Sequence, residues 1–359
     1  MIIRAGQADI RLAEWLDLSR LRSLAIIGMG KNAGKTTVLN HILAVCDRTE
    51  LDRPLAVTSI GRDGEEEDLV TGGGKPRIYL KKHSLIATAC DSLSQCDAVL
   101  EILALTGIHT ASGEVTIART RSNGYIELSG PSMAGDLRVC ETLLREAEPN
   151  CLFLVDGALS RKSPAGGGLT KAVILVAGVA NAVSVNELAQ KTARQVSFLT
   201  LPAMDEADRK ACLEVLRDNR GVRAVIMEHR QGGIRRMLEL ASLIGSGKQI
   251  AAALQPEDTL LLVSGAVTDR VVTELLASDS LSGMTLAAED GTRFFLDEKS
   301  LARLEHRGVK LAVLHQLLLP LVCVNPMRRD GSFTDSDELV RALSAVIDRP
   351  VVDLGPALV

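Results

Sequence analysis

Short, unbroken apolar runs alternate with amphipathic stretches along most of the chain. The runs at residues 24–27, 151–155 and 172–177 have the continuous hydrophobicity of strands that are buried on both faces, as in a parallel sheet covered by helices. Residues 35–45 and 132–147 have the helical spacing of apolar positions. This pattern predicts an α/β fold with a mostly parallel sheet flanked by helices.

The same rhythm continues to the end of the chain. Further strands are predicted at 55–60, 222–227, 259–263 and 321–324, and further helices at 206–217, 268–277, 335–346 and between 299 and 306. The length of 359 residues favours two domains. Because glycine and polar residues interrupt the rhythm at 230–233, we expect a first domain over 1–232 and a smaller α/β domain over 233–359.

Weaker patterns predict, in chain order, a helix over about 91–105, a hairpin from 114–119 and 125–128, a strand near 196–199, and a short helix followed by a buried strand within 311–324. The hairpin is predicted because Asn123-Gly124, between alternating segments, provides the positive-φ residues of a tight turn. It would form an antiparallel insertion in the first domain.

Composition and charge exclude several classes of function. The formal net charge is −4 and 2% of the residues are aromatic, so the chain has neither the basic field nor the rings of a nucleic-acid binder. The sequence shows no apolar stretch of membrane-spanning length and no apolar leader, so we expect a cytoplasmic protein without a membrane partner. Seven cysteines without a CxxC pair predict reduced, mostly buried thiols.

A glycine-rich segment follows the first strand and opens the first helix: Gly28-Met29-Gly30-Lys31-Asn32-Ala33-Gly34-Lys35-Thr36-Thr37. Glycines allow backbone N–H groups to converge on phosphate oxygens, a lysine neutralises the terminal phosphates, and a hydroxyl reaches Mg²⁺. We therefore expect a P-loop of the NTPase type at the edge of the sheet. Its expected nucleotide-binding residues are Gly30, Lys31, Asn32, Ala33, Gly34, Lys35, Thr36 and Thr37.

Two details of this segment depart from the usual spacing. The first glycine of the pattern GxxxxGK[ST] falls on Met29, with Gly28 and Gly30 on either side. Lys31 lies one residue short of the signature lysine of P-loop variants that reach across a dimer interface. Two roles stay open for Lys31: that contact, or a lysine exposed on the loop.

Two aspartates are candidate partners of Mg²⁺. Asp156 follows directly on the apolar strand at 151–155. P-loop proteins place a carboxylate beside the phosphates at the end of such a strand. The alternative is that Asp156 only caps the next turn. Asp63 follows the strand at 55–60 and is expected to hold Mg²⁺ through water or to orient the nucleophile, with Glu65 a weaker alternative. The candidate catalytic residues are Lys35, Asp63 and Asp156, and the candidate metal ligands are Thr36, Asp63 and Asp156.

Neighbouring residues narrow the chemistry further. Arg62 and Arg161 lie beside these aspartates in the sequence, and either stabilise charge on a transferred phosphoryl group or form surface ion pairs. The Asn-Lys-x-Asp element that reads guanine is missing, so the expected cofactors are ATP and Mg²⁺.

These motifs resemble those of known families. The phosphate loop, the acidic turn after the second strand and Val155-Asp156-Gly157-Ala158 resemble the dethiobiotin-synthetase-like branch of P-loop NTPases. A closer resemblance, to the reactivase subunit that accompanies adenosylcobalamin-dependent lysine 5,6-aminomutase, covers most of the chain. It rests on GKNAGKTT (30–37), TSIGRDGE (58–65), KPRIY (75–79), TGI (106–108), GPS (130–132), VDGALSRKS (155–163) and VNP (324–326).

The resemblance implies an auxiliary ATPase that helps to exchange a damaged corrinoid in the aminomutase, together with a partner ATPase subunit. Two alternatives stay open. One is a small-molecule ligase or kinase of the dethiobiotin synthetase type, with Lys75 and Arg77 as anchors for an acid, and the other is a nucleotide-binding regulator without turnover. The second domain favours the auxiliary role, because a chaperone needs an exposed protein-binding surface. No Asp-x-His-x-x-Gly element is present, so direct corrinoid binding is not expected.

Overall fold

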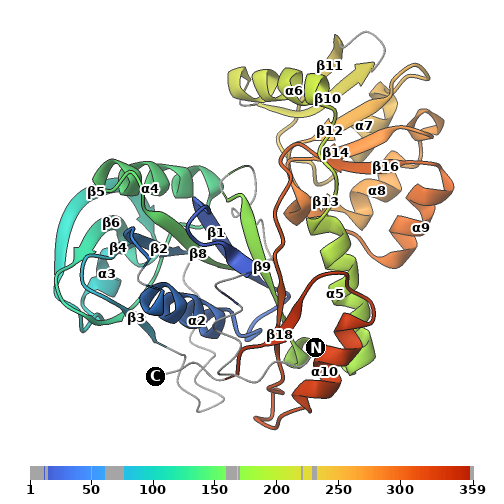
Figure 1. Cartoon of the computed structure of the whole chain (residues 1–359). Helices are drawn as coiled ribbons and strands as arrows, with labels where there is room; N and C mark the ends of the chain where they lie inside the picture. Colours follow the sequence, from blue (N-terminus) through green and yellow to red (C-terminus); the bar gives the residue numbers. More distant parts are fainter. Residues whose placement is uncertain are drawn as a thin grey trace. The chain divides into compact units, whose positions relative to one another are not determined.

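The computed structural model describes residues 12, 15–49, 51–60, 77–158, 168, 170–219, 221–228 and 233–355. Two compact units are distinguished in this part of the chain. The second unit is built from Ser197–Leu317 with Gly168, and the first from the other described residues on either side of that segment. Each unit has its own sheet and helices (Figure 1).

The first unit centres on a sheet of nine strands within the described residues, in the order β18-β17-β9-β1-β8-β2-β4-β6-β5. The strands are β1 (Ser23–Gly28), β2 (Leu55–Ser59), β4 (Leu85–Ala89), β5 (Leu100–Thr110), β6 (Gly113–Thr120), β8 (Leu152–Ala158), β9 (Ala172–Gly178), β17 (Val322–Asn325) and β18 (Val351–Asp353). All neighbours from β18 to β4 are parallel, whereas β6 is antiparallel to β4 and β5. A mostly parallel sheet is therefore confirmed.

Helices flank this sheet because their apolar stripes complete its core. They are α2 (Lys35–Arg48), α3 (Cys90–Leu93), α4 (Ala134–Ala147), α5 (Val185–Leu199) and α10 (Ser336–Ser344), and a small ribbon pairs β3 (Ile78–Leu80) with β7 (Gly124–Ile126). Val38, Leu39 and Ile42 of α2 belong to the same buried cluster as Leu24 and Ile26 of β1. The predicted helices at 35–45 and 132–147 are thus confirmed as α2 and α4.

The second unit is a smaller α/β unit. Its sheet has the order β11-β10-β12-β14-β16, formed by β10 (Val222–Glu228), β11 (Gly233–Glu239), β12 (Leu260–Val263), β14 (Thr285–Ala288) and β16 (Lys310–Val313). The accompanying helices are α6 (Glu206–Asp218), α7 (Gly247–Ala253), α8 (Asp269–Leu275) and α9 (Glu298–His306). The rings of Phe198 and Phe294 stack in its core, with centroids 5.6 Å apart. No helix in the described part of either unit combines the length and apolar character that a membrane crossing requires.

The expected boundary after residue 232 does not coincide with this division. β17, β18 and α10 come late in the chain but belong to the first unit. β17 pairs in parallel with β9, and Leu321 and Cys323 are buried in the core of the first unit. The point where the chain returns to the first unit lies within the apolar run at 311–324 and has no sequence signal of its own. This run contains the end of β16 of the second unit and most of β17 of the first, with no helix between them.

Two predictions around the antiparallel edge are wrong. β6 pairs with β5, and β7 pairs instead with β3. Gly113, with a φ of 94°, provides the positive-φ residue at the turn between β5 and β6, so the Asn-Gly pair is not needed there. The helix predicted over 91–105 is replaced by α3 and the start of β5, because pairing with β6 outweighs the helical propensity of that segment.

The strand predicted near 196–199 is also wrong, because α5 continues to Leu199. Leu188, Thr192, Val196 and Leu199 are all buried and recur at helical spacing. The short apolar stretch therefore completes the buried stripe of a helix.

Buried thiols are confirmed for most of the cysteines. Five of the seven are buried, one is partly buried, and Cys90 is exposed. Burial raises the pKa of the Cys46 thiol to about 12, so this thiol is neutral at physiological pH.

Because the chain returns to the first unit after residue 317, its last segment should stabilise the core of that unit. Leu321→Ala removes a fully buried side chain from the first core and should lower the free energy of unfolding by about 2–5 kcal/mol. Leu318→Ala is the matched control, because the Leu318 side chain is 54% exposed. Urea unfolding is followed by the fluorescence of Trp15, the single tryptophan, which packs against this core. Equal midpoints for the two variants would contradict the assignment.

Candidate functional site

The segment between β1 and α2 lies at the carboxyl edge of the parallel strands. Side chains alternate along a strand, so Ile26 and the position of Gly28 face α2, as do Leu154 and Asp156 of β8. β1 and β8 are in parallel register, with Ile26 opposite Asp156. This register brings the Asp156 carboxylate beside the first turn of α2.

Gly34, the residue before α2, has a left-handed backbone conformation. Its φ of 99° and ψ of 17° are rarely adopted by residues with a side chain. A Cβ at Gly34 would also lie 3.1 Å from Nδ2 of Asn325. The first N–H groups of a helix have no intrahelical acceptor, and the helix macrodipole favours an anion in front of them. The left-handed turn at Gly34 leads directly into the start of α2, the end of a helix that favours an anion.

Gly28, the last residue of β1, makes room for the side chain of Lys35. A Cβ at Gly28 would lie 2.9 Å from Cγ of Lys35 and 3.1 Å from Cβ of Ala33. Lys35 is 6% exposed, so its stem lies along the end of β1 instead of extending into solvent. Glycine at this position is thus a steric requirement for holding the lysine close to the loop.

Thr36 and Asp156 meet through a direct hydrogen bond. The Thr36 hydroxyl donates to Oδ2 of Asp156 over 3.1 Å. Both side chains are buried, with 9% of Thr36 and 6% of Asp156 exposed. The sequence predicted this pair from two motifs 120 residues apart, and the structure brings it together.

Two asparagines from other strands close around the loop. Asn325, at the end of β17, donates through Nδ2 to the carbonyl of Asn32 over 3.3 Å. Asn181 ends η2 (Val179–Asn181), the turn after β9, and a Cβ on Gly30 would overlap with its Oδ1. Sequence reasoning gave neither asparagine a role. The available signal was position, because each is a polar residue at or just after the end of a buried parallel strand.

Met29 occupies the position where the usual spacing has glycine. Its backbone φ is not positive, so no glycine is required there. Its amide donates to the carbonyl of Val176 over 3.0 Å, and its sulfur accepts a hydrogen bond from the Thr192 hydroxyl of α5. The departure from the pattern is therefore accommodated by the neighbouring strand and helix.

The remaining predicted residues are placed as follows. Lys31 is exposed, Ala33 is buried, and Thr37, two residues after Lys35 in α2, is partly buried. Asn32 has a φ of 55°. Asparagine tolerates this left-handed conformation better than most residues. The predicted Asp63, with Arg62, Glu65, Lys75 and Arg161, lies outside the described residues.

The described residues fit a phosphate group with a divalent cation. At Gly28, Gly30 and Gly34 the place of a Cβ is taken by the side chains of Lys35, Asn181 and Asn325, so glycine lets these side chains lie directly against the loop. Ala33 is packed as closely, with its Cα 2.9 Å from where a Cβ on Gly178 would lie. The start of α2 and the Lys35 ammonium supply positive charge. The hydroxyl of Thr36 and the carboxylate of Asp156 supply the oxygen ligands that Mg²⁺ prefers.

No protein-family model matches the chain, and no curated protein shows a significant match to it. The site is therefore interpreted from its own geometry.

The hydrogen bond between Thr36 and Asp156 can be tested without a ligand. Thr36→Val keeps the shape of the side chain but leaves the buried carboxylate without this donor, and should lower the free energy of unfolding by about 1–3 kcal/mol. Thr36→Ser retains the hydroxyl and is the control. The measurement is urea unfolding monitored by Trp15 fluorescence. A Thr36→Val midpoint equal to that of Thr36→Ser would show that the bond contributes no stability.

Proposed function

We propose that the chain binds ATP with Mg²⁺ at the loop between β1 and α2. The observation that carries this proposal is the buried hydrogen bond between Thr36 and Asp156, at a helix start that follows the left-handed Gly34. A hydroxyl from the first turn of the helix and a carboxylate from the neighbouring strand is the pair that P-loop proteins use for Mg²⁺.

Each residue has a role in this proposal. Backbone N–H groups at the start of α2 hold the phosphates, and the Lys35 ammonium neutralises charge on the terminal groups. Thr36 and Asp156 hold Mg²⁺, and Asp63 is proposed as a further carboxylate that positions water. Bound Mg²⁺–ATP supplies a phosphoanhydride whose hydrolysis releases free energy. Asn181 and Asn325 keep the loop in its open shape, through contacts with Gly30 and with the carbonyl of Asn32.

The biological role that we propose is that of an ATP-dependent auxiliary protein, which reactivates a cobalamin-dependent aminomutase with a partner ATPase subunit. This part rests on the motif resemblance. The second α/β unit supports it, because a unit of this size provides surface for a partner protein beyond what nucleotide binding needs.

Nucleotide binding is the first test. Lys35→Ala removes the charged donor to the terminal phosphates and should weaken ATP binding by about 2 kcal/mol, or roughly thirtyfold in Kd. The measurement is isothermal titration of Mg²⁺–ATP. Lys248→Ala, at an exposed lysine of the second unit, is the control and should leave the Kd unchanged. An ATP affinity that survives in folded Lys35→Ala would remove the assignment.

Turnover is the second test. Asp156→Asn keeps the shape of the carboxylate but weakens its hold on Mg²⁺, so we expect phosphate release to fall by roughly 10- to 100-fold with ATP binding less affected. Phosphate release is measured with and without an inactivated cobalamin-dependent aminomutase. Stimulation by the mutase is the expected result. Turnover that instead requires a small carboxylic acid would favour a ligase of the dethiobiotin synthetase type.

A further inference from the structure

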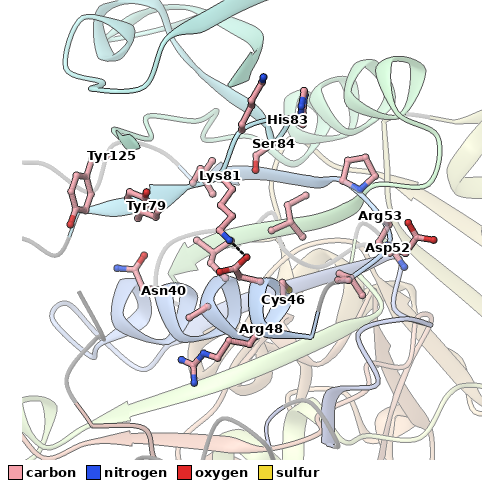
Figure 2. A pocket seen from close by; sticks show the side chains of 18 of the residues that line it. Asn40, Cys46, Arg48, Asp52, Arg53, Tyr79, Lys81, His83, Ser84 and Tyr125 are labelled. Carbon is pink, nitrogen blue, oxygen red and sulfur yellow. Dashed lines mark ion pairs between the residues drawn. The ribbon is translucent and has the colours of Figure 1, made fainter. Parts of the chain in front are cut away.

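A groove lies along the second half of α2, beneath the segment that carries β3 (Figure 2). Its volume is about 1220 Å³, which is enough for a ligand of several tens of atoms. In Figure 2, Asn40, Cys46 and Arg48 line it from α2, Tyr79 and Lys81 line it from the opposite wall, and Asp52 and Arg53 stand at one end. The groove borders the carboxyl-terminal half of α2, whereas the phosphate loop lies at the start of that helix.

The floor of the groove is apolar. Leu43 of α2 and Leu80 of β3 are 7% and 1% exposed, and Leu51, Pro54 and Leu55 continue the apolar lining. Such a surface stabilises a ligand in proportion to the apolar area that it covers. Leu51, Pro54 and Leu55 are only partly buried, so they offer apolar surface to the body of a ligand.

The rim of the groove is cationic. Among the described residues, five cationic side chains line it, Arg48, Arg53, Arg77, Lys81 and Lys82, against two carboxylates. Lys81 pairs with Asp47, as the dashed line in Figure 2 marks, and Arg77 pairs with a carboxylate outside the groove. Because the whole chain has a net charge of −4, this local excess of positive charge is a specific feature of the groove.

Arg53 is a cation of the groove that is compensated by backbone carbonyls. Its two terminal nitrogens donate to the backbone carbonyls of Ser19 and Cys151, over 3.0 and 3.1 Å. Its Nε is buried and donates to no acceptor in the described part of the chain, where no carboxylate pairs with the guanidinium either. Burial lowers the pKa of Arg53, and the nearby cation Arg145 lowers it further. The guanidinium therefore adds positive charge at this end of the groove that no carboxylate in the described residues cancels.

An aromatic pair borders the groove. The rings of Tyr79 and Tyr125 meet edge to face with centroids 5.3 Å apart, and the guanidinium of Arg77 lies 4.9 Å from the centroid of Tyr125. Tyr79 is 45% exposed. Its ring therefore offers a surface on which a flat group can stack.

We propose that this groove binds a soluble organic anion, in which a flat or chain-like apolar body covers the leucine floor and a carboxylate or phosphate group meets the cationic rim. The apolar floor and the cationic rim act together. A ligand that covered only the floor would remove water from the cations without pairing them, and a ligand that met only the cations would leave the floor in water. The site is separate from the phosphate loop and does not depend on the proposed nucleotide.

The probe is 1-naphthyl phosphate, which combines an aromatic body with a dianion. Isothermal titration of the full-length protein should show one site per chain, with an affinity that weakens as salt is added. Binding should persist in Lys35→Ala, because the groove lies away from the phosphate loop. The cation 1-naphthylmethylamine, which has the same aromatic body, should bind much more weakly.

The double variant Arg48→Ala/Lys82→Ala removes two exposed cations from the rim and should weaken 1-naphthyl phosphate binding by about tenfold. Its matched control is Lys248→Ala/Lys299→Ala, which removes the same charge from exposed positions of the second unit. The proposal is overturned if wild type does not bind the probe, if the rim variant binds as tightly as the control, or if the cationic analogue binds equally well. Loss of binding in folded Lys35→Ala would place the probe at the phosphate loop and also overturn it.

Discussion

The hydrogen bond from Thr36 to Asp156 depends on the register of two parallel strands. β1 and β8 are neighbours, and a shift of one residue in β8 would turn Asp156 away from α2 to the opposite face of the sheet. Leu154, two residues before Asp156 on β8, and Ile26, two residues before Gly28 on β1, are buried in the core that α2 covers. Their packing fixes this register. The core of the first unit therefore determines the geometry of the candidate site.

A second constraint is the closeness of backbone segments at this edge of the sheet. Gly28 lies against the stem of Lys35, and Gly178 lies against the backbone of Ala33. Neither has a positive φ, so the requirement here is for space. Gly34 needs both space and a left-handed conformation. The loop is thus shaped by the strands around it as much as by its own sequence.

Local patterns predicted the central part of the fold and of the site. β1, α2, β8 and β9 each coincide with a continuous apolar run or a helical stripe, and the glycine-rich segment marks their junction. The strand β5 was missed because its partner is β6, and propensity over 91–105 gives no information on pairing. The expected boundary after residue 232 was wrong because the second unit begins at Ser197, inside α5, where no break in the helical pattern marks it. The return to the first unit was missed because one apolar run contributes to β16 and to β17, which belong to different units. Asn181 and Asn325 could not be assigned, since their contacts with the loop arise from β9 and β17 joining β1 in one sheet.

The two ends of α2 have opposite electrostatics, and this decides how each can hold an anion. At its start, the macrodipole and the N–H groups of a helix's first turn favour negative charge. At its end the macrodipole is negative, and an anion there requires side chains that outweigh it. Arg48 in the last turn, with Lys81 and Arg53 from neighbouring segments, places cationic charge at that end. In a chain of net charge −4, an anion at the end of α2 would have to be held by side chains, whereas at its start the helix itself would contribute.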